Sequence, residues 1–300
     1  MTRGEQSRAM KYHTGNLSEA ETMPSQTYHV PQGGHPAQTE LLSGRAVFTN
    51  AYAVIPGGVQ RDIVVSHLPH WDNTRVWVLA RPLSGFAETF SHYLMEVAPG
   101  GGSELPEPDK DAEGALFVAG GKLSLVVADN ERELRPGGFA YLPPGRGWSI
   151  RNRSSSPAHF HWIRKLYQGV PGLAHPDVIV TNEDSVASTL MPDTDGRWRT
   201  TRFIDPADIR YDMHINIVTF EPGASIPFTE THVMEHGLYV LEGKAVYRLN
   251  QDWVEVEAGD FMWLRAFCPQ ACYAGGPGRF RYLLYKDVNR HMDLRPFTAA

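Results

Sequence analysis

Short runs of apolar residues, separated by turn-forming residues, follow one another along most of the chain. In residues 122–130 (KLSLVVADN) and 244–250 (KAVYRLN), apolar and polar positions alternate, which is typical of a β-strand with one buried face. The first segment, for example, places Leu123, Leu125 and Val127 on one side. The 28 glycines and 22 prolines provide frequent turns. The pattern therefore predicts an all-β fold built from many short strands.

The pattern of the chain also repeats once. Residues 96–125 correspond to residues 219–248 at an offset of 123, so that Pro99 faces Pro222 and Gly114 faces Gly237. Downstream, the offset falls to 122. Two copies of one all-β unit predict two tandem antiparallel jelly-roll β-barrels. The expected divisions are a flexible N-terminal tail (1–38), an N-terminal barrel (39–170), a turn-rich connecting segment (171–200) and a C-terminal barrel (201–300).

Composition and charge exclude several classes of protein. The net charge of −6 and the absence of a basic stripe argue against nucleic acid as a partner. No stretch approaches 18 apolar residues, and the N-terminus lacks the apolar core of a signal peptide, so we expect no membrane contact and a cytoplasmic location. Cys268 and Cys272 are expected to be reduced and buried.

Two motifs in each copy resemble those of the cupin superfamily, whose ligand positions are two histidines, a glutamate and a third histidine. In the N-terminal copy these positions hold Glu107, Asp109, Glu113 and Trp148. Three carboxylates could bind a hard cation. The surrounding sequence, GSELPEPDKDAEG, is instead more typical of a solvated acidic loop. We therefore expect a metal-free N-terminal barrel of this bicupin.

The C-terminal copy has a ligand-capable side chain at all four positions, which are Glu230, His232, His236 and Gln270. Along an extended chain, residues 230 and 232 point to the same side. A carboxylate, two imidazoles and an amide oxygen suit Mn, Fe or Zn. The competing acid is Glu235, which an extended chain would point away from His232. We predict one divalent metal in this barrel.

A narrower resemblance is carried by ETHVMEHGLYVLEGKAVY, by residues 270–273 and by YLLYKDVNR. These segments resemble the (S)-ureidoglycine aminohydrolases of allantoin catabolism, in purine degradation. The resemblance covers residues 39–293 and implies a Mn²⁺-dependent hydrolase, with one Mn²⁺ held by a Glu, His, His, Gln set. It implies release of ammonia from (S)-ureidoglycine to give (S)-ureidoglycolate.

Further residues are candidates for substrate contact and proton transfer. Lys286, on the last strand, is the expected cation near the substrate carboxylate and the expected proton donor. Glu230 could also act as a general base. Tyr247 and Tyr282 are candidates for orienting the substrate. His159 and His161 lie in the equivalent of the last strand, where no ligand position exists, and are expected to be structural.

Two other classes of function stay open on the sequence alone. The first is an Fe(II) cupin dioxygenase acting on a small organic acid, since one carboxylate and two histidines resemble its facial triad. The second is a non-enzymatic bicupin that binds a small molecule. A homo-oligomer is expected in each case, because sheet edges are common assembly surfaces.

Overall fold

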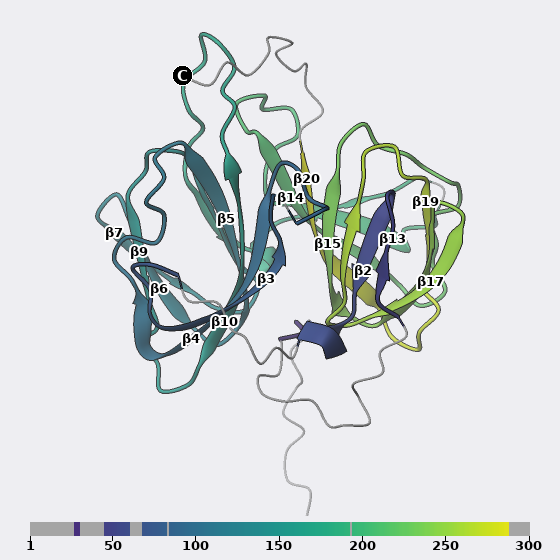
Figure 1. The fold of residues 1–300 in the computed structure, drawn as a ribbon, viewed down its shortest axis with the longest axis horizontal. Coiled ribbons are helices and arrows are strands. Elements are labelled where there is room, and N and C mark those ends of the chain that lie inside the picture. The colour runs from purple at the N-terminus through teal and green to yellow at the C-terminus, as the bar shows by residue number, and fades with distance from the viewer. Residues whose placement is uncertain (1–26, 31–44, 61–67, 83, 193, 288–300) are drawn as a thin grey trace, which may run out of the picture.

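The computed structural model describes residues 27–30, 45–60, 68–82, 84–192 and 194–287. The described part of the chain forms two β-barrels that lie side by side (Figure 1). The elements before the inter-barrel segment are β1 (Val47–Phe48), β2 (Tyr52–Ile55), η2 (Gly57–Gln60), β3 (Asp72–Ala80), β4 (Ser91–Ser103), β5 (Ala112–Gly120), β6 (Leu123–Val127), β7 (Asn130–Leu134), β8 (Gly138–Leu142), β9 (Trp148–Arg151) and β10 (Ala158–Leu166). The remaining elements are β11 (Ile179–Asn182), η3 (Glu183–Ser185), β12 (Ser188–Leu190), β13 (Trp198–Arg202), β14 (Met213–Phe220), β15 (His236–Glu242), β16 (Lys244–Leu249), β17 (Asp252–Glu257), β18 (Phe261–Leu264), β19 (Gln270–Tyr273) and β20 (Phe280–Asp287). The prediction of an all-β fold with two tandem antiparallel barrels is confirmed.

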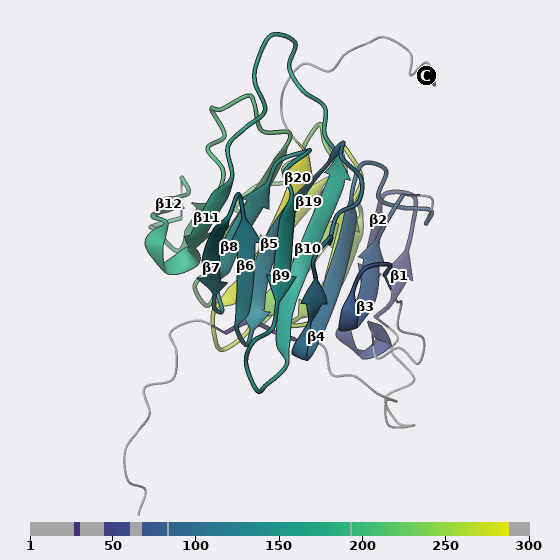
Figure 2. The ribbon, with the colours of Figure 1, turned by 90° about the vertical axis from the view of Figure 1, so that its left-hand side faces the viewer.

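Three antiparallel sheets build the two barrels. The N-terminal barrel is one nine-stranded sheet of order β11-β8-β5-β10-β4-β9-β6-β7, in which β3 pairs with β4. Figure 2 faces the outer side of this sheet. The C-terminal barrel combines an eight-stranded sheet of order β1-β2-β18-β15-β20-β14-β13-β12 with a three-stranded sheet of order β17-β16-β19. The predicted alternation is confirmed in β6 and β16, where every second residue is buried.

Apolar side chains collect in three clusters. One fills the N-terminal barrel and includes Leu125 and Val118. A second fills the C-terminal barrel and includes Leu249 and Val240. The third, around Phe90 and its neighbours, lies between the barrels. Because successive residues of a strand point to opposite sides, β5 and β15 contribute alternately to a barrel interior and to the cluster between the barrels.

Strand pairing contradicts the predicted ranges 39–170 and 171–200, and the boundary at residue 201 falls inside β13, while residue 39 lies outside the described residues. Strand β2, which precedes the N-terminal barrel in sequence, pairs with β18 of the C-terminal barrel. The predicted connection is not a linker, since its strand β11 pairs with β8 of the N-terminal barrel. Strands β12 and β13 then extend the C-terminal sheet through β14. The pairing of β2 with β18 satisfies backbone groups of β18 that would otherwise be open.

The prediction of a flexible tail does not hold for residues 27–30, while residues 1–26 and 31–38 lie outside the described part. Tyr28 packs its ring against Phe117 of the N-terminal barrel and donates a hydrogen bond to Glu183. The His29 amide donates to the Leu241 carbonyl of the C-terminal barrel, at 2.9 Å. This short segment therefore contacts both barrels. The Tyr28 ring supplies apolar area for this contact, although the tail is polar on average, and the prediction rested on that average.

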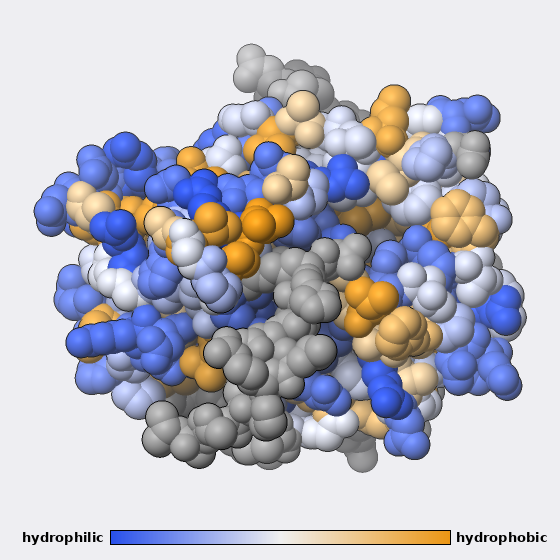
Figure 3. All heavy atoms as spheres, turned by 90° about the horizontal axis from the view of Figure 1, so that it is seen from above, coloured by the Kyte–Doolittle hydropathy of each residue, from blue (hydrophilic) through white to orange (hydrophobic). Residues whose placement is uncertain are grey.

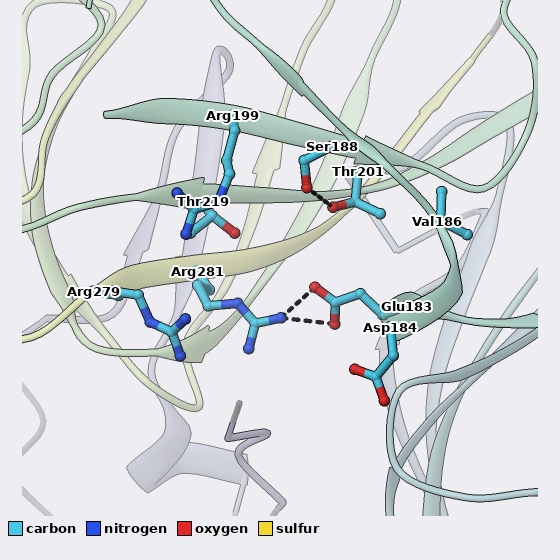
Figure 4. A pocket seen from close by; sticks show the side chains of 9 residues that line it. All are labelled: Glu183, Asp184, Val186, Ser188, Arg199, Thr201, Thr219, Arg279 and Arg281. Atoms are coloured by element: carbon cyan, nitrogen blue, oxygen red, sulfur yellow. Dashed lines mark hydrogen bonds and ion pairs between the residues drawn. The ribbon is translucent and has the colours of Figure 1, made fainter. Parts of the chain in front are cut away.

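A buried ion pair joins η3, the short helix after β11, to the last strand, β20. The Arg281 guanidinium donates to both oxygens of Glu183, at 2.5 and 2.7 Å, and both side chains are almost fully buried. Figure 4 shows the pair pointing at each other in a polar pocket of about 300 Å³, with Arg199 and Arg279 beside it. Bidentate pairing of this kind fixes the orientation of both groups.

Two buried histidines meet between the barrels. His92 on β4 and His161 on β10 lie 3.0 Å apart through Nε2 and Nδ1. The ring of His161 packs on Tyr239 of the C-terminal barrel, and the hydroxyl of Tyr239 lies 2.9 Å from Nδ1 of His29. Burial lowers the pKa of His92 to about 3 and lowers the pKa of His161 well below its usual value. The prediction of a structural His161 is thus confirmed.

Substitution of Glu183 tests the buried ion pair. Glu183→Gln should lower the free energy of unfolding by about 3 kcal/mol, because Arg281 would remain buried without a balancing charge. Denaturant unfolding followed by circular dichroism measures this change. Asp184→Asn is the matched control, because its partner Arg135 lies at the surface, and the change should stay below about 0.5 kcal/mol. Equal effects of the two substitutions would contradict the assignment.

The histidine pair predicts a pH dependence of stability. Both pKa values are lowered in the folded chain, so the contribution is complete above pH 6.5 and is lost as the pH falls toward 3, since only the unfolded chain binds these protons. Between pH 6 and 5, the double substitution of His92 and His161 by Leu should reduce the slope of unfolding free energy against pH by about 2 kcal/mol per unit. Urea unfolding at several pH values measures that slope, and an unchanged slope would refute the prediction.

Candidate active site in the C-terminal barrel

At the first motif, the strand pairings match residues of the two barrels at an offset that differs by one from the offset of the sequence repeat. In the N-terminal barrel Gly114 pairs with Leu142, and in the C-terminal barrel His236 pairs with Leu264. The offset is therefore already 122 in β5 and β15, and the N-terminal copy of Gly237 is not Gly114. The position of His236 is held by Gly114, and the assignment of Glu113 to a ligand position is wrong. A shift of one residue moves a side chain to the other face of a strand.

Glu113 accordingly points away from the N-terminal barrel interior. It is fully buried, and it accepts a hydrogen bond of 2.5 Å from Tyr141, a residue of the cluster between the barrels. Glu107 is also largely buried, with 8% of its side chain exposed, and it pairs with Arg164 at 2.5 Å. The predicted solvated acidic loop is wrong for these two residues, whereas Asp109, Glu104 and Asp111 are exposed. Each of these two carboxylates is buried with a hydrogen-bonding partner that lies far away in sequence.

The N-terminal barrel offers few ligands at the four cupin positions. Gly114 has no side chain, and the indole nitrogen of Trp162 lies 3.1 Å from where a β-carbon of residue 114 would stand. Trp148 is buried and packs edge-on against Trp162. An arginine already neutralises Glu107, as described above. These residues surround a pocket of about 320 Å³ with indole rings and an ion pair instead of a set of ligands.

The C-terminal barrel brings all four predicted ligands to one cavity of about 110 Å³. Glu230 and Gln270 face each other across two backbone hydrogen bonds of 2.9 Å between the loop and β19. His232 lies 3.5 Å from Glu230, measured from Nε2 to Oε1. The His232 and His236 rings lie 4.7 Å apart, centroid to centroid. Three separate parts of the chain thus converge on the cavity wall.

Lys286 lines the same cavity from β20. It pairs with His236 on β15 and with His214 on β14, so the three side chains form a row on the inner face of the sheet. Burial, together with the nearby Arg202 guanidinium, lowers the pKa of Lys286. Burial and the charge of Lys286 lower the pKa of His214 to about 4. The row therefore favours neutral imidazoles around one amine.

The two tyrosine candidates occupy different places. Tyr282 lines the cavity, two residues before Leu284 and four before Lys286 on β20. Tyr247 lies behind it in the barrel core and does not line the cavity. The Tyr247 hydroxyl is fully buried beside Tyr282 and Cys272, and burial raises its pKa well above 10. Cys268 and Cys272 are free and buried, as predicted.

A known protein family matches the chain twice, once in each barrel. The model of the cupin domain matches residues 93–164 and 216–285. An (S)-ureidoglycine aminohydrolase of Arabidopsis thaliana is 33% identical over 85% of this chain and 83% of its own length. The corresponding enzyme of Escherichia coli is 29% identical over 85% of this chain and 95% of its own. The chain belongs to the (S)-ureidoglycine aminohydrolase family of cupins.

A solved structure extends the comparison. A Pseudomonas aeruginosa protein named as glyoxylate induced has 67% sequence identity and a TM-score of 0.84, and the match covers 90% of this chain and 98% of that one. No helix among the described residues has the length and hydropathy needed to cross a membrane.

Sequence reasoning missed part of this family member's cavity wall. Arg202 on β13 and Asn216 on β14 both line the cavity, as does Thr200. Arg202 lies two residues beyond the predicted linker, and its place depended on a pairing between β13 and β14 that no local pattern reveals. Asn216 could have been suspected as a polar residue within the apolar strand MHINIVTF.

The competing acid Glu235 faces away from the cavity, as the extended-chain argument predicted. Its carboxylate accepts a hydrogen bond of 2.8 Å from the indole of Trp263 and further bonds from residues 88 and 89. Both of its oxygens are therefore engaged on the side of the strand that faces the other barrel.

The chemistry of the donor set fits a divalent metal. Nδ1 of His236 donates to the Met234 carbonyl at 3.1 Å, which leaves Nε2 with its lone pair for a ligand. Burial lowers the pKa of His236 to about 3, so the ring is neutral, as a ligand must be. Across the described residues, no three Asp, Glu, His or Cys side chains already converge on one point. Gln270 completes a borderline-hard set with Glu230 and His232.

Substitution of Trp148 tests the contrast between the barrels. Trp148→His adds an imidazole to the N-terminal barrel, but Gly114 still supplies no ligand and Arg164 still neutralises Glu107. We expect no second metal per chain, together with a lower melting temperature from the lost packing against Trp162. Metal-to-protein ratio by mass spectrometry after dialysis checks this. A second tightly bound ion would show that the N-terminal barrel can hold a metal.

Proposed function

We propose that this chain releases ammonia from (S)-ureidoglycine to give (S)-ureidoglycolate, with a Mn²⁺ ion held by Glu230, His232, His236 and Gln270. Membership of the family supports the reaction. The observation that carries the proposal is that these four donors and Lys286 all line one cavity.

The cavity offers complementary groups for each part of such a substrate. Lys286 and Arg202 supply positive charge for the carboxylate. The Asn216 amide and the Tyr282 hydroxyl can donate and accept hydrogen bonds with a ureido group. A volume of about 110 Å³ suits a small molecule. Holding the substrate at both ends orients its central carbon, which carries the amine.

The reaction breaks one carbon–nitrogen bond and forms one carbon–oxygen bond to water. The departing amine needs a proton, and Lys286 is placed to give it, because its lowered pKa brings the ammonium closer to neutral pH. The incoming water loses a proton, and the Glu230 carboxylate is the candidate base. The bound Mn²⁺ would act as a Lewis acid that withdraws electron density from the groups it contacts.

Three further expectations belong to this proposal. Fe or Zn in place of Mn²⁺ is compatible with the same donors. A homo-oligomer is supported by exposed apolar residues near the site, with Val233 58% and Phe267 65% exposed. On the face seen in Figure 3, apolar side chains lie in small groups among polar ones. A cytoplasmic location stays a prediction, and no described feature favours dioxygenase chemistry or a purely binding role.

Substitution of Lys286 tests the reaction. Lys286→Met keeps most of the side-chain length but removes charge and proton, so turnover should fall about 100-fold, in the range expected for loss of a positioned acid. Ammonia release from freshly generated ureidoglycine, under anaerobic conditions, measures turnover. Retained metal, determined by mass spectrometry, separates this effect from loss of the ion. Near-normal turnover would remove Lys286 from the mechanism.

His236→Ala serves as the complementary variant, because it should lose both the metal and ammonia release. Wild-type protein that consumes oxygen, and releases no ammonia from ureidoglycine, would replace the proposed hydrolysis with the dioxygenase alternative.

A further inference from the structure

Glu235 stands directly before His236 in the chain but points to the opposite side. His236 belongs to the cavity, whereas Glu235 is 7% exposed in the contact between the barrels. The residue before it, Met234, supplies the carbonyl that holds Nδ1 of His236. A displacement of the Glu235 backbone would therefore shift the backbone of His236 and also the Met234 carbonyl that orients the His236 ring.

Donors from the N-terminal half of the chain surround the Glu235 carboxylate. The Thr89 amide donates at 2.6 Å and the Thr89 hydroxyl at 2.5 Å, both to Oε1. The Glu88 amide lies 3.0 Å from Oε2, which also accepts from Trp263. Hydrogen bonds to a charged acceptor are stronger than neutral ones, so this carboxylate is held firmly.

The backbone of residues 87–90 is shaped for this contact. Ala87 has a φ of 61°, a left-handed conformation that costs about 1 kcal/mol for a residue with a β-carbon. The turn presents two successive amides to one carboxylate, as in other anion-binding backbone nests. Phe90 then packs so closely on Gly237 that a β-carbon there would lie 2.7 Å from its ring.

The same segment also reaches the neighbour of Lys286. The Thr89 hydroxyl lies 3.0 Å from the hydroxyl of Tyr285, and Phe90 stacks on the Tyr285 ring at 4.0 Å between centroids. Tyr285 precedes Lys286 on β20 and points to the side between the barrels. One threonine thus touches the chain neighbours of a predicted ligand and of the predicted proton donor.

We propose that Glu235 is a positioning residue of the C-terminal site. Residues 87–90 of the N-terminal half set the depth and orientation of His236 through Glu235, and those of Lys286 through Tyr285. Successive residues of a strand project to opposite faces, so fixing Glu235 and Tyr285 between the barrels fixes their neighbours in the cavity. The part of this proposal that concerns Lys286 and catalysis rests on the proposed function. The part that concerns His236 as a ligand does not depend on the substrate.

Two threonine variants test the proposal with little change in volume. Thr89→Val removes the hydroxyl that bridges Glu235 and Tyr285, while Thr89→Ser keeps it. Loss of a group that orients a metal ligand commonly lowers metal affinity or activity by 10- to 100-fold. We expect Thr89→Val to weaken Mn²⁺ binding by about 10-fold and to lower kcat more than it raises KM, whereas Thr89→Ser stays within about 2-fold of wild type. Glu235→Gln should have a larger effect, because its amide group must face donors.

Glu183→Gln is the control for a merely structural role, because it breaks a buried contact near the opposite end of β20 from Lys286, and neither Glu183 nor Arg281 lines the cavity. It should lower the melting temperature but leave the Mn²⁺ dissociation constant unchanged. Isothermal titration with Mn²⁺ alone, thermal melting and steady-state ammonia release give the three readouts. If Thr89→Val and Glu235→Gln behave like Glu183→Gln, Glu235 only stabilises the fold and the proposal is overturned.

The experiment also separates this proposal from the proposed function. Wild-type protein that binds Mn²⁺ but releases no ammonia would remove the proposed reaction, and the metal affinities of the variants would still decide the role of Glu235. Wild-type protein without affinity for Mn²⁺ would refute both the ligand assignment and the positioning role.

Discussion

The contact between the barrels is the constraint on which the rest of the structure depends. A β-strand offers two faces, and strands β5, β15 and β20 use one face for a barrel interior and the other for the shared cluster. The position of each cavity residue is therefore set by what its neighbour meets on the other side. His236 follows Glu235, and Lys286 follows Tyr285, in this alternation. The packing between the barrels consequently determines the positions of the side chains in the C-terminal cavity.

The two barrels show how one framework supports different interiors. Both copies keep the strand registers, with Gly114 and His236 opposite equivalent leucines. In the N-terminal copy the space of an imidazole is taken by the indole of Trp162, and Arg164 stands opposite Gly114 where Lys286 stands opposite His236. A guanidinium bound to a carboxylate thus stands where the C-terminal barrel has the Lys286 amine, and Gly114 and Trp148 stand where it has two ligands, around a pocket of about 320 Å³.

Much of the fold and the site could be predicted from the sequence, because both are encoded in local patterns. Alternating residues revealed strands such as β6 and β16, and the spacing of Glu230, His232 and His236 placed them on one frame. The errors have a common cause, since each depends on partners distant in sequence. Strand β2 pairs with β18 across about two hundred residues, Tyr28 meets Glu183, and Glu113 was misplaced by one residue between two otherwise regular repeats. Periodicity describes which side of a strand is buried but not what it will be buried against.

The pairing of β2 with β18 has a consequence for how the molecule comes into being. During synthesis, residues 52–55 leave the ribosome long before residues 261–264 exist to receive them. The early strand must wait with its backbone groups unpaired while an entire barrel is made, and contacts of such high sequence separation form slowly. For that interval it is an exposed edge on which another nascent chain could pair. The C-terminal sheet is therefore completed only when β18, made late in synthesis, pairs with β2, which was made early.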